Sequence, residues 1–143
     1  MQASSSVISA LPIETNSDLA WVRRQVRRAA TDLGLGLVQQ TRLVTAASEL
    51  ARNALVHGGG GEVEIAHVAT GGGRGLRLVF TDRGPGIPDL DQVLTGGPTT
   101  GGGLGMGLGG TKRLVHEFAI ESGPGVGTTI QIIVWASGLP SPR

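Results

Sequence analysis

The chain has 143 residues, a length typical of a single domain, and contains no cysteine. The absence of cysteine excludes disulfide scaffolds, thiolate metal sites and cysteine nucleophiles. Lys and Arg number 12 against 11 Asp and Glu, and the net charge of +1 argues against a nucleic-acid-binding protein. Glycine is the compositional anomaly, at 25 of 143 residues, or about 17% against an ordinary share of about 7%.

The N-terminal segment, residues 1–14, is small and polar, so we expect residues 1–10 to be frayed. A short strand over residues 7–13 is expected at its end. This segment has neither the basic start nor the apolar stretch of a signal peptide. No stretch approaches the roughly 20 apolar residues that cross a membrane. We therefore expect a cytoplasmic protein with no membrane partner.

Apolar residues at helical spacing predict two helices, the first capped by Ser17 and reaching residue 33, the second over residues 38–56. Glycines at 34 and 36 end the first helix, and the run at 58–61 ends the second. The outer face of the first helix carries four arginines, which either dock an acidic partner or, as is more usual for such a face, are solvated: Arg23, Arg24, Arg27 and Arg28.

Alternating residues predict strands over residues 62–69 and 75–81, which form a hairpin, and a second hairpin over 119–122 and 128–135. Between the hairpins we expect a short helix at 90–94, a glycine-rich loop at 96–110 and a helix at 111–117. This order predicts an α+β fold, a two-layer sandwich of a mixed, mostly antiparallel sheet with helices on one face. A single domain would span residues 15–136, followed by a flexible tail at 137–143.

The segment SELARN places Glu49 and Asn53 one turn apart on the second helix, and His57 extends the same line. A carboxylate and a carboxamide in this arrangement suit a hard cation such as Mg²⁺. The carboxylate could also deprotonate or orient a nucleophile. The alternative is an ordinary solvated face on which Glu49 pairs with Arg52.

The segment DRGPGIP ends a strand with Asp82, and Gly84 and Gly86 follow closely. Such a carboxylate can accept a hydrogen bond from the amino group of adenine, while the glycines allow a flat base to approach the backbone. The segment GVGTT opens the last strand and would bring Thr128 near the same base. The alternative for both segments is a simple turn.

The segment GGGLGMGLGG, residues 101–110, precedes a helix, and its exposed amides could converge on an anion. A flexible linker is the alternative. Leucine and methionine alternate with the glycines here, which disfavours that alternative because a solvated linker more often carries serine.

Taken together and in this order, these segments resemble the GHKL ATPase superfamily, which includes gyrase, Hsp90, histidine kinases and MutL. The resemblance covers about residues 15–135. Within the superfamily, ASELARN, DRGPGIPDLDQV and GGGLGMGLGGTKRLVHEF are most similar to the small serine/threonine kinases and switch proteins of the RsbT type.

The resemblance implies a site for ATP and Mg²⁺ between sheet and helices, under a lid. Glu49 would be the catalytic base or would position the attacking hydroxyl. Asn53 would hold the metal that bridges the phosphates, and Asp82 would bind the amino group of adenine with support from Thr128. Arg83 is given no role. Gly84 and Gly86 would let the nucleotide approach, and the lid and phosphate cradle would comprise Gly101, Gly102, Gly103, Leu104, Gly105 and Gly107.

The resemblance also implies partners. Proteins of the RsbT type phosphorylate STAS-domain proteins within stress-sensing complexes, the stressosomes, and then activate a PP2C-type phosphatase in a cascade that ends on a sigma factor. Two alternatives stay open. One is an anti-sigma factor kinase of the RsbW or SpoIIAB type that sequesters a sigma factor, and the other is a nucleotide-binding switch without catalysis.

Overall fold

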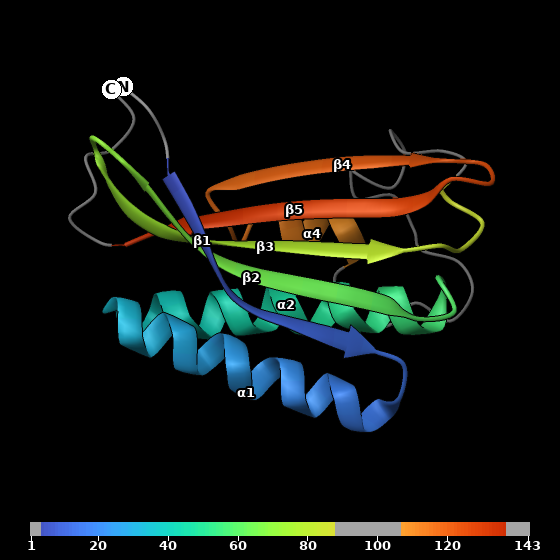
Figure 1. Cartoon of the computed structure of the whole chain (residues 1–143), viewed down its shortest axis with the longest axis horizontal. Coiled ribbons are helices and arrows are strands. Elements are labelled where there is room, and N and C mark those ends of the chain that lie inside the picture. The colour runs from blue at the N-terminus through green and yellow to red at the C-terminus, as the bar shows by residue number, and fades with distance from the viewer. Residues whose placement is uncertain (1–3, 88–106, 137–143) are drawn as a thin grey trace.

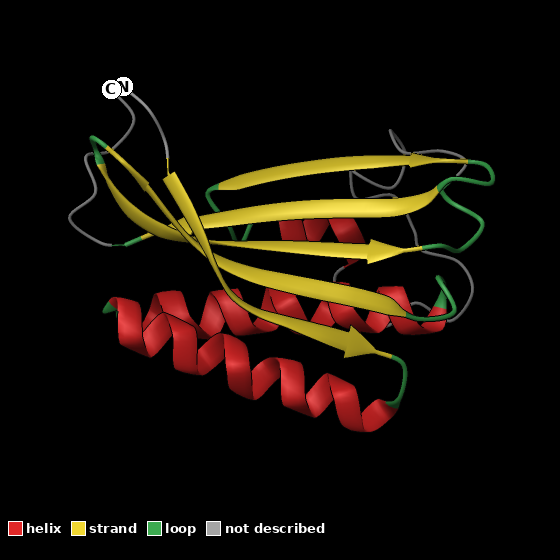
Figure 2. Ribbon diagram, viewed as in Figure 1, coloured by secondary structure: helices red, strands yellow, loops and turns green. Residues whose placement is uncertain are grey.

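The computed structural model describes residues 4–87 and 107–136. In these ranges an antiparallel sheet of order β1-β2-β3-β5-β4 is covered on one face by the helices (Figures 1 and 2). The strands are β1 (Ser4–Ile13), β2 (Gly61–Thr70), β3 (Gly73–Asp82), β4 (Glu117–Gly123) and β5 (Gly127–Trp135), and the helices are α1 (Asn16–Leu33), α2 (Leu37–Val56) and α4 (Gly107–Lys112). The predicted α+β class is confirmed, and every described strand pairing is antiparallel.

The hydrophobic core lies between the sheet and the helices. Alternate residues of the central strands face it, as in Leu76, Leu78 and Phe80 of β3. The core stripe of α2 is rich in alanine, and small side chains allow a helix to lie close to its neighbours. The buried residues of α2 are Leu43, Ala46, Ala47, Leu50, Ala51 and Ala54.

The start of α1 corrects the prediction that Ser17 is its N-cap. Thr15 is the N-cap, and it forms a capping box with Asp18. The Asp18 N–H donates to Thr15 Oγ1 at 3.2 Å, and the Thr15 N–H donates to Asp18 Oδ2 at 3.0 Å. The Glu14 N–H also donates to Asp18 Oδ2, and this bond to the ionised carboxylate is the main reason that the pKa of Asp18 is lowered.

The N-terminal segment forms a longer strand than expected. Residues 4–10 were predicted to be frayed, but β1 begins at Ser4 and pairs along β2, from Ser4 opposite Ala69 to Ile13 opposite Gly61. Most of these side chains are exposed, so the pattern of apolar residues does not reveal the strand. Backbone pairing with the free edge of β2 accounts for it. The domain limits at residues 15 and 136 stay a prediction.

The helix predicted over residues 111–117 is wrong in both bounds. The helix α4 is Gly107–Lys112, and Glu117 already begins β4. Residues 117–123 pair with β5 as strand β4. The Trp135 N–H also donates to Nδ1 of His116 at 2.8 Å. These long-range bonds outweigh the local helical spacing of Leu114 and Val115. The short helix predicted at 90–94 lies outside the described residues.

Within the described residues, no helix is both long and apolar enough to cross a membrane.

The capping box predicts a specific stability effect. We expect Thr15→Ala to lower the free energy of unfolding by about 1 kcal/mol, because the Asp18 N–H loses its side-chain partner. Urea denaturation at pH 7 measures this change. Thr41→Ala is the matched control, since Thr41 is exposed within α2, and we expect its effect to stay within about 0.5 kcal/mol. An unchanged Thr15→Ala variant would contradict the capping assignment.

Candidate active site

Asp82 ends β3 on the face of the sheet that the helices cover. It follows Leu78 and Phe80 at alternate positions, and both of these side chains are buried in the core. Its strand partners are Gly61 on β2 and Thr128 on β5. Asp82 Oδ1 accepts a hydrogen bond from the Gly84 N–H at 2.9 Å, which fixes the carboxylate at the start of the following loop. The register therefore brings Asp82 and Thr128, two predicted site residues, to neighbouring positions.

Glycine is required around Asp82 by the packing of the chain itself. A Cβ added to Gly58, just after α2, would collide with the Asp82 side chain and lie 2.6 Å from its Cβ. A Cβ on Gly84 would lie 2.6 Å from the Gly58 Cα. Gly86 has a φ of +85° and packs against the backbone of Gly123. The predicted role of Gly84 and Gly86 in admitting a nucleotide stays a prediction beside this structural role.

Glu49 and Asn53 lie on α2 and are partly buried, at the border of its alanine-rich stripe. The Asn53 carbonyl accepts the N–H groups of His57 at 2.9 Å and of Gly58 at 3.2 Å, which ends the helix. Gly58 packs against Asp82 at the end of α2. Asn53 lies about one helical turn before Gly58, and Glu49 lies about one turn before Asn53. The structure thus brings the helix and strand motifs to one end of the molecule. His57 is exposed, as expected for the end of a helix.

A hydroxyl network continues the site beyond Thr128. Ser122 on β4 is the strand partner of Thr128, and their hydroxyl oxygens lie 2.8 Å apart. The Ile87 N–H donates to Ser122 Oγ at 2.8 Å, so the loop after Asp82 is tied to β4. Sequence analysis missed Ser122, Gly58 and Gly127. The alternation of Phe118, Ile120 and Ser122 could have placed Ser122 on the helix-facing side.

The glycine-rich segment is only partly described. Gly107 is buried, has a φ of +66° and begins α4, and its carbonyl accepts the hydroxyl of the fully buried Thr111 at 2.9 Å. The helix α4 packs against α2, the helix that carries Glu49 and Asn53. The other predicted lid residues lie outside the described residues, and these are Gly101, Gly102, Gly103, Leu104 and Gly105.

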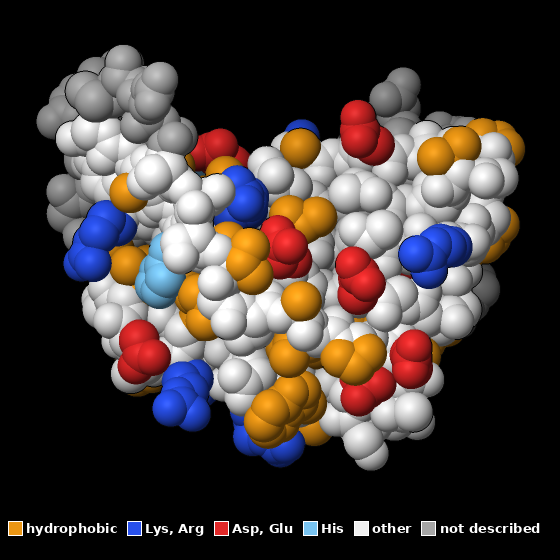
Figure 3. Space-filling model, in the orientation of Figure 1, with side chains coloured by type: hydrophobic (Ala, Val, Ile, Leu, Met, Phe, Trp, Pro, Cys, Tyr) orange, Lys and Arg blue, Asp and Glu red, His pale blue; other side chains and the backbone are white. Residues whose placement is uncertain are grey.

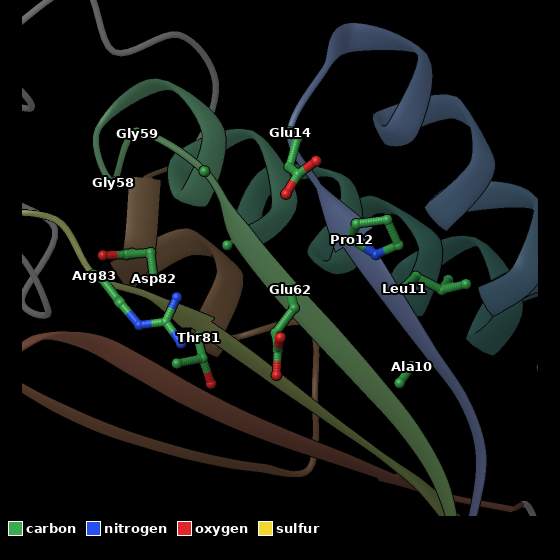
Figure 4. Close-up of a pocket in the computed structure, with 12 residues that line it drawn as sticks. Ala10, Leu11, Pro12, Glu14, Gly58, Gly59, Glu62, Thr81, Asp82 and Arg83 are labelled. Carbon is green, nitrogen blue, oxygen red and sulfur yellow. The ribbon is translucent and has the colours of Figure 1, made fainter.

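An open pocket of about 610 Å³ lies beside Asp82 (Figure 4). Glu62 and Thr81, which line it, alternate with core residues and so belong to the outer face of the sheet. Its wall also includes Pro12 of β1 and the arginine that follows Asp82, Arg83. Among the described residues that line it, Asp82 is the only predicted site residue. The pocket is therefore distinct from the space between sheet and helices where the prediction puts the nucleotide.

Metal binding has limited support from protein groups alone. Within residues 4–87 and 107–136, no three His, Cys, Asp or Glu side chains lie close enough to hold an ion. Asn53 offers a carboxamide oxygen, the kind of ligand that Mg²⁺ accepts, but further ligands would have to come from the phosphates of a nucleotide. Asn53 fits this shared coordination because it is partly buried and its carbonyl accepts the N–H of Gly58, which packs against Asp82.

The arginine-rich face of α1 has partners within the chain. Arg27 Nη1 donates to Gln40 Oε1 on α2 at 3.3 Å. The Arg24 guanidinium lies over the Trp21 ring, 5.3 Å from its centroid, where a cation–π interaction is favourable. Figure 3 shows hydrophobic and basic side chains together over α1 at the lower edge of the molecule. Docking of an acidic partner by this face stays a prediction.

Comparison with known proteins identifies the family. The model of the histidine kinase-, DNA gyrase B- and HSP90-like ATPases matches residues 38–137, more than half of the chain. The chain belongs to this family. The recognition of a GHKL ATPase is thus confirmed, and the predicted binding of ATP agrees with it.

One relative is the serine/threonine-protein kinase RsbT of Bacillus subtilis (strain 168). It is 46% identical to this chain over 127 residues, which are 89% of this chain and 96% of that protein. The RsbT-like serine/threonine kinase prediction is confirmed by this relative. The anti-sigma F factor of Bacillus licheniformis is 34% identical over 104 residues, 64% of this chain and 66% of that protein.

Solved structures support the same fold. The RsbU and RsbW domains of Rv1364c from Mycobacterium tuberculosis match 92% of this chain with a TM-score of 0.60 and 26% identity. This chain spans only 32% of that protein. The mycobacterial sensor histidine kinase MprB matches 90% of this chain and 97% of its own, with a TM-score of 0.55 and 22% identity, and it supports the fold alone.

The packing around Asp82 makes a testable prediction. We expect Gly58→Ala to weaken ATP binding at least tenfold and to destabilise the fold by about 1–3 kcal/mol, because its Cβ would displace the Asp82 side chain. Isothermal titration calorimetry and urea denaturation measure the two effects. Gly123→Ala is the matched control, since its Cβ would meet only Val126 at 3.9 Å. If the two variants have equal ATP affinity and equal free energy of unfolding, the prediction is wrong.

Proposed function

We propose that the protein is an ATP- and Mg²⁺-dependent protein serine/threonine kinase of the RsbT type. The observation that carries the proposal is the meeting of Asp82 and Thr128 on adjacent strands, against the end of the helix that bears Glu49 and Asn53. The 46% identity to the serine/threonine-protein kinase RsbT, over nearly all of both chains, supports the same activity.

In this proposal Asp82 accepts a hydrogen bond from the amino group of adenine, and Thr128 supports it. Thr128 is buried and Asp82 is partly buried, which limits competition from water. Gly84 and Gly86 keep the loop beside Asp82 free of side chains. The lid residues Gly101, Gly102, Gly103, Leu104, Gly105 and Gly107 would supply amides to the phosphates.

Glu49 is the proposed catalytic base. It would take the proton from the substrate serine or threonine hydroxyl as that oxygen attacks the γ-phosphorus. The bond between the γ-phosphorus and the bridging oxygen then breaks, and ADP leaves. A bound Mg²⁺ would neutralise phosphate charge, and Asn53 is the residue that would hold it.

The partners follow from the resemblance. We propose that the protein phosphorylates a STAS-domain protein of a stressosome in the cytoplasm and then activates a PP2C-type phosphatase in sigma-factor regulation. The relation to RsbT, and to an anti-sigma factor, supports a place in such a regulatory system. No nucleic acid or membrane partner is proposed.

A second candidate function is sequestration of a sigma factor. The observation that favours it is the 34% identity to the anti-sigma F factor. Such a protein also binds ATP, so ATP binding alone does not separate the two functions. A stable complex with a purified sigma factor, seen by gel filtration, would favour sequestration.

Two substitutions separate binding from transfer. We expect Asp82→Asn to weaken ATP binding by at least about tenfold, because a neutral amide replaces the charged acceptor. Glu49→Ala should keep the ATP dissociation constant and lose phosphoryl transfer by about 100-fold or more. Calorimetry and a single-turnover transfer assay measure these effects. Asp32→Asn, at the exposed end of α1, is the control. Normal ATP affinity in Asp82→Asn would refute the site.

The kinase activity itself is tested with a STAS-domain protein, ideally one encoded beside this chain. Incubation with the protein and Mg-ATP should add one phosphate to it, measured as intact mass. The gain should be absent with Glu49→Ala. If ATP binds and no phosphate is gained, the kinase proposal fails, and sequestration or a non-catalytic switch takes its place.

A further inference from the structure

The Ser122 hydroxyl on β4 makes three polar contacts, one with the loop after β3 and two with β5. Ser122 is half-buried near the end of β4 and belongs to a row of residues that crosses four strands on the helix-facing side: Gly61, Asp82, Thr128 and Ser122. Its Oγ accepts the Ile87 N–H at 2.8 Å, lies 3.1 Å from the Gly127 carbonyl oxygen, and lies 2.8 Å from Thr128 Oγ1.

The number of hydrogens decides the direction of these bonds. A serine hydroxyl has one hydrogen to donate and two lone pairs to accept with. All three contacts are hydrogen bonds together only if Ser122 accepts from Ile87, donates to the Gly127 carbonyl and accepts from Thr128. The Thr128 hydroxyl hydrogen then points at Ser122, and only lone pairs of Thr128 remain for other partners.

This assignment changes what the site offers to a base. Asp82 is an acceptor when ionised, and its neighbour Thr128 becomes an acceptor too. Two adjacent acceptors suit a base that presents an amino group directly to them. They do not suit a base that presents a carbonyl, because neither side chain could donate to it.

We propose that Ser122 is a positioning residue that selects ATP over nucleotides with a carbonyl at position 6 of the purine, by holding Thr128 as an acceptor. The proposal rests on the nucleotide site of the proposed function. Ser122 acts through Thr128 and through Ile87 in the loop that follows Asp82. Since all three of its partners lie on the adenine side of the proposed site, away from Glu49 on α2, it affects base selection and not phosphoryl transfer.

The test compares ATP with inosine triphosphate, which carries a carbonyl in place of the adenine amino group. Calorimetry gives both dissociation constants for the full chain and for Ser122→Ala. We expect the variant to weaken ATP binding, and to lower the ratio that favours ATP by about tenfold, because the freed Thr128 hydroxyl can donate to the carbonyl.

A merely structural role would behave differently. Loss of packing alone would raise both dissociation constants equally and leave their ratio unchanged, which would overturn the proposal. Ser122→Thr keeps the hydroxyl and should keep the ratio. Thr129→Ala, which lies next to Thr128 on β5 but on the opposite face of the sheet, is the control and should also keep the ratio.

A double-mutant cycle tests the pathway through Thr128. Thr128→Val removes the acceptor for the adenine amino group and should lower the ratio for that reason, and adding Ser122→Ala to it should lower the ratio no further. Additive effects would show that Ser122 does not act through Thr128 and would refute the proposal. If Ser122→Ala does not fold, Ser122→Cys carries the same test, because a thiol keeps the volume and hydrogen-bonds weakly.

Failure of the proposed function would give a different result from failure of the role proposed for Ser122. A wild-type protein that binds neither nucleotide would refute the nucleotide site itself. A wild-type protein that prefers ATP, together with a folded Ser122→Ala variant of equal preference, would refute only the role of Ser122.

Discussion

The antiparallel register of β2, β3, β5 and β4 is the constraint on which the site depends. It aligns Gly61, Asp82, Thr128 and Ser122 in one row on the helix-facing side of the sheet. A shift of one residue in any pairing would turn that strand's side chain to the opposite face. Core residues two positions along each strand, such as Val63, Phe80 and Ile130, prevent such a shift, because it would turn them out of the core. The hydrophobic core therefore holds the polar row in place.

This row of residues packs directly against the backbone at the end of α2. Gly58 meets the Asp82 side chain, and Gly84 meets Gly58. Helix α2 can reach this position because alanines form most of its buried stripe. The partly buried Glu49 and Asn53 are thereby carried to the same end of the sheet as Asp82. Small residues in the helix and glycines in the loops thus have the same effect, which is to let the two layers pack closely at this end of the sheet.

The chemistry of the row explains how one fold can serve different regulators. Asp82, Thr128 and Ser122 concern the base, whereas Glu49 and Asn53 concern the phosphates in the proposed function. Relatives with this architecture include a protein named as a serine/threonine kinase and one named as an anti-sigma factor. The base-recognising end can be common to both, while partner recognition is a property of other surfaces.

Local patterns were enough for most of the fold. Helical spacing of apolar residues located α1 and α2, and alternation located β2, β3 and β5, because each element buries a single stripe or face. The errors occurred where long-range contacts compete with local preference. The exposed residues of β1 are held by the edge of β2, and residues 113–117 lose their helical preference to the pairing of β4 with β5. The prediction that Ser17 is the N-cap of α1 was wrong for a local reason, because Thr15 is the N-cap and forms a capping box with Asp18.

The sequence by itself determined the fold class, the family and the residue types that suit a nucleotide, because motif order and periodicity are local properties of the chain. Only the tertiary structure decided which of those residues meet. Asp82 and Thr128 are 46 positions apart in the chain, and strand register makes them neighbours. Alternation along β4 indicates only which face Ser122 occupies, and Gly58 and Gly127 carry no signal of their own, since glycines after a helix or in a turn are common in any protein. Their importance comes from what lies across from them, and that is set by packing between strands and layers.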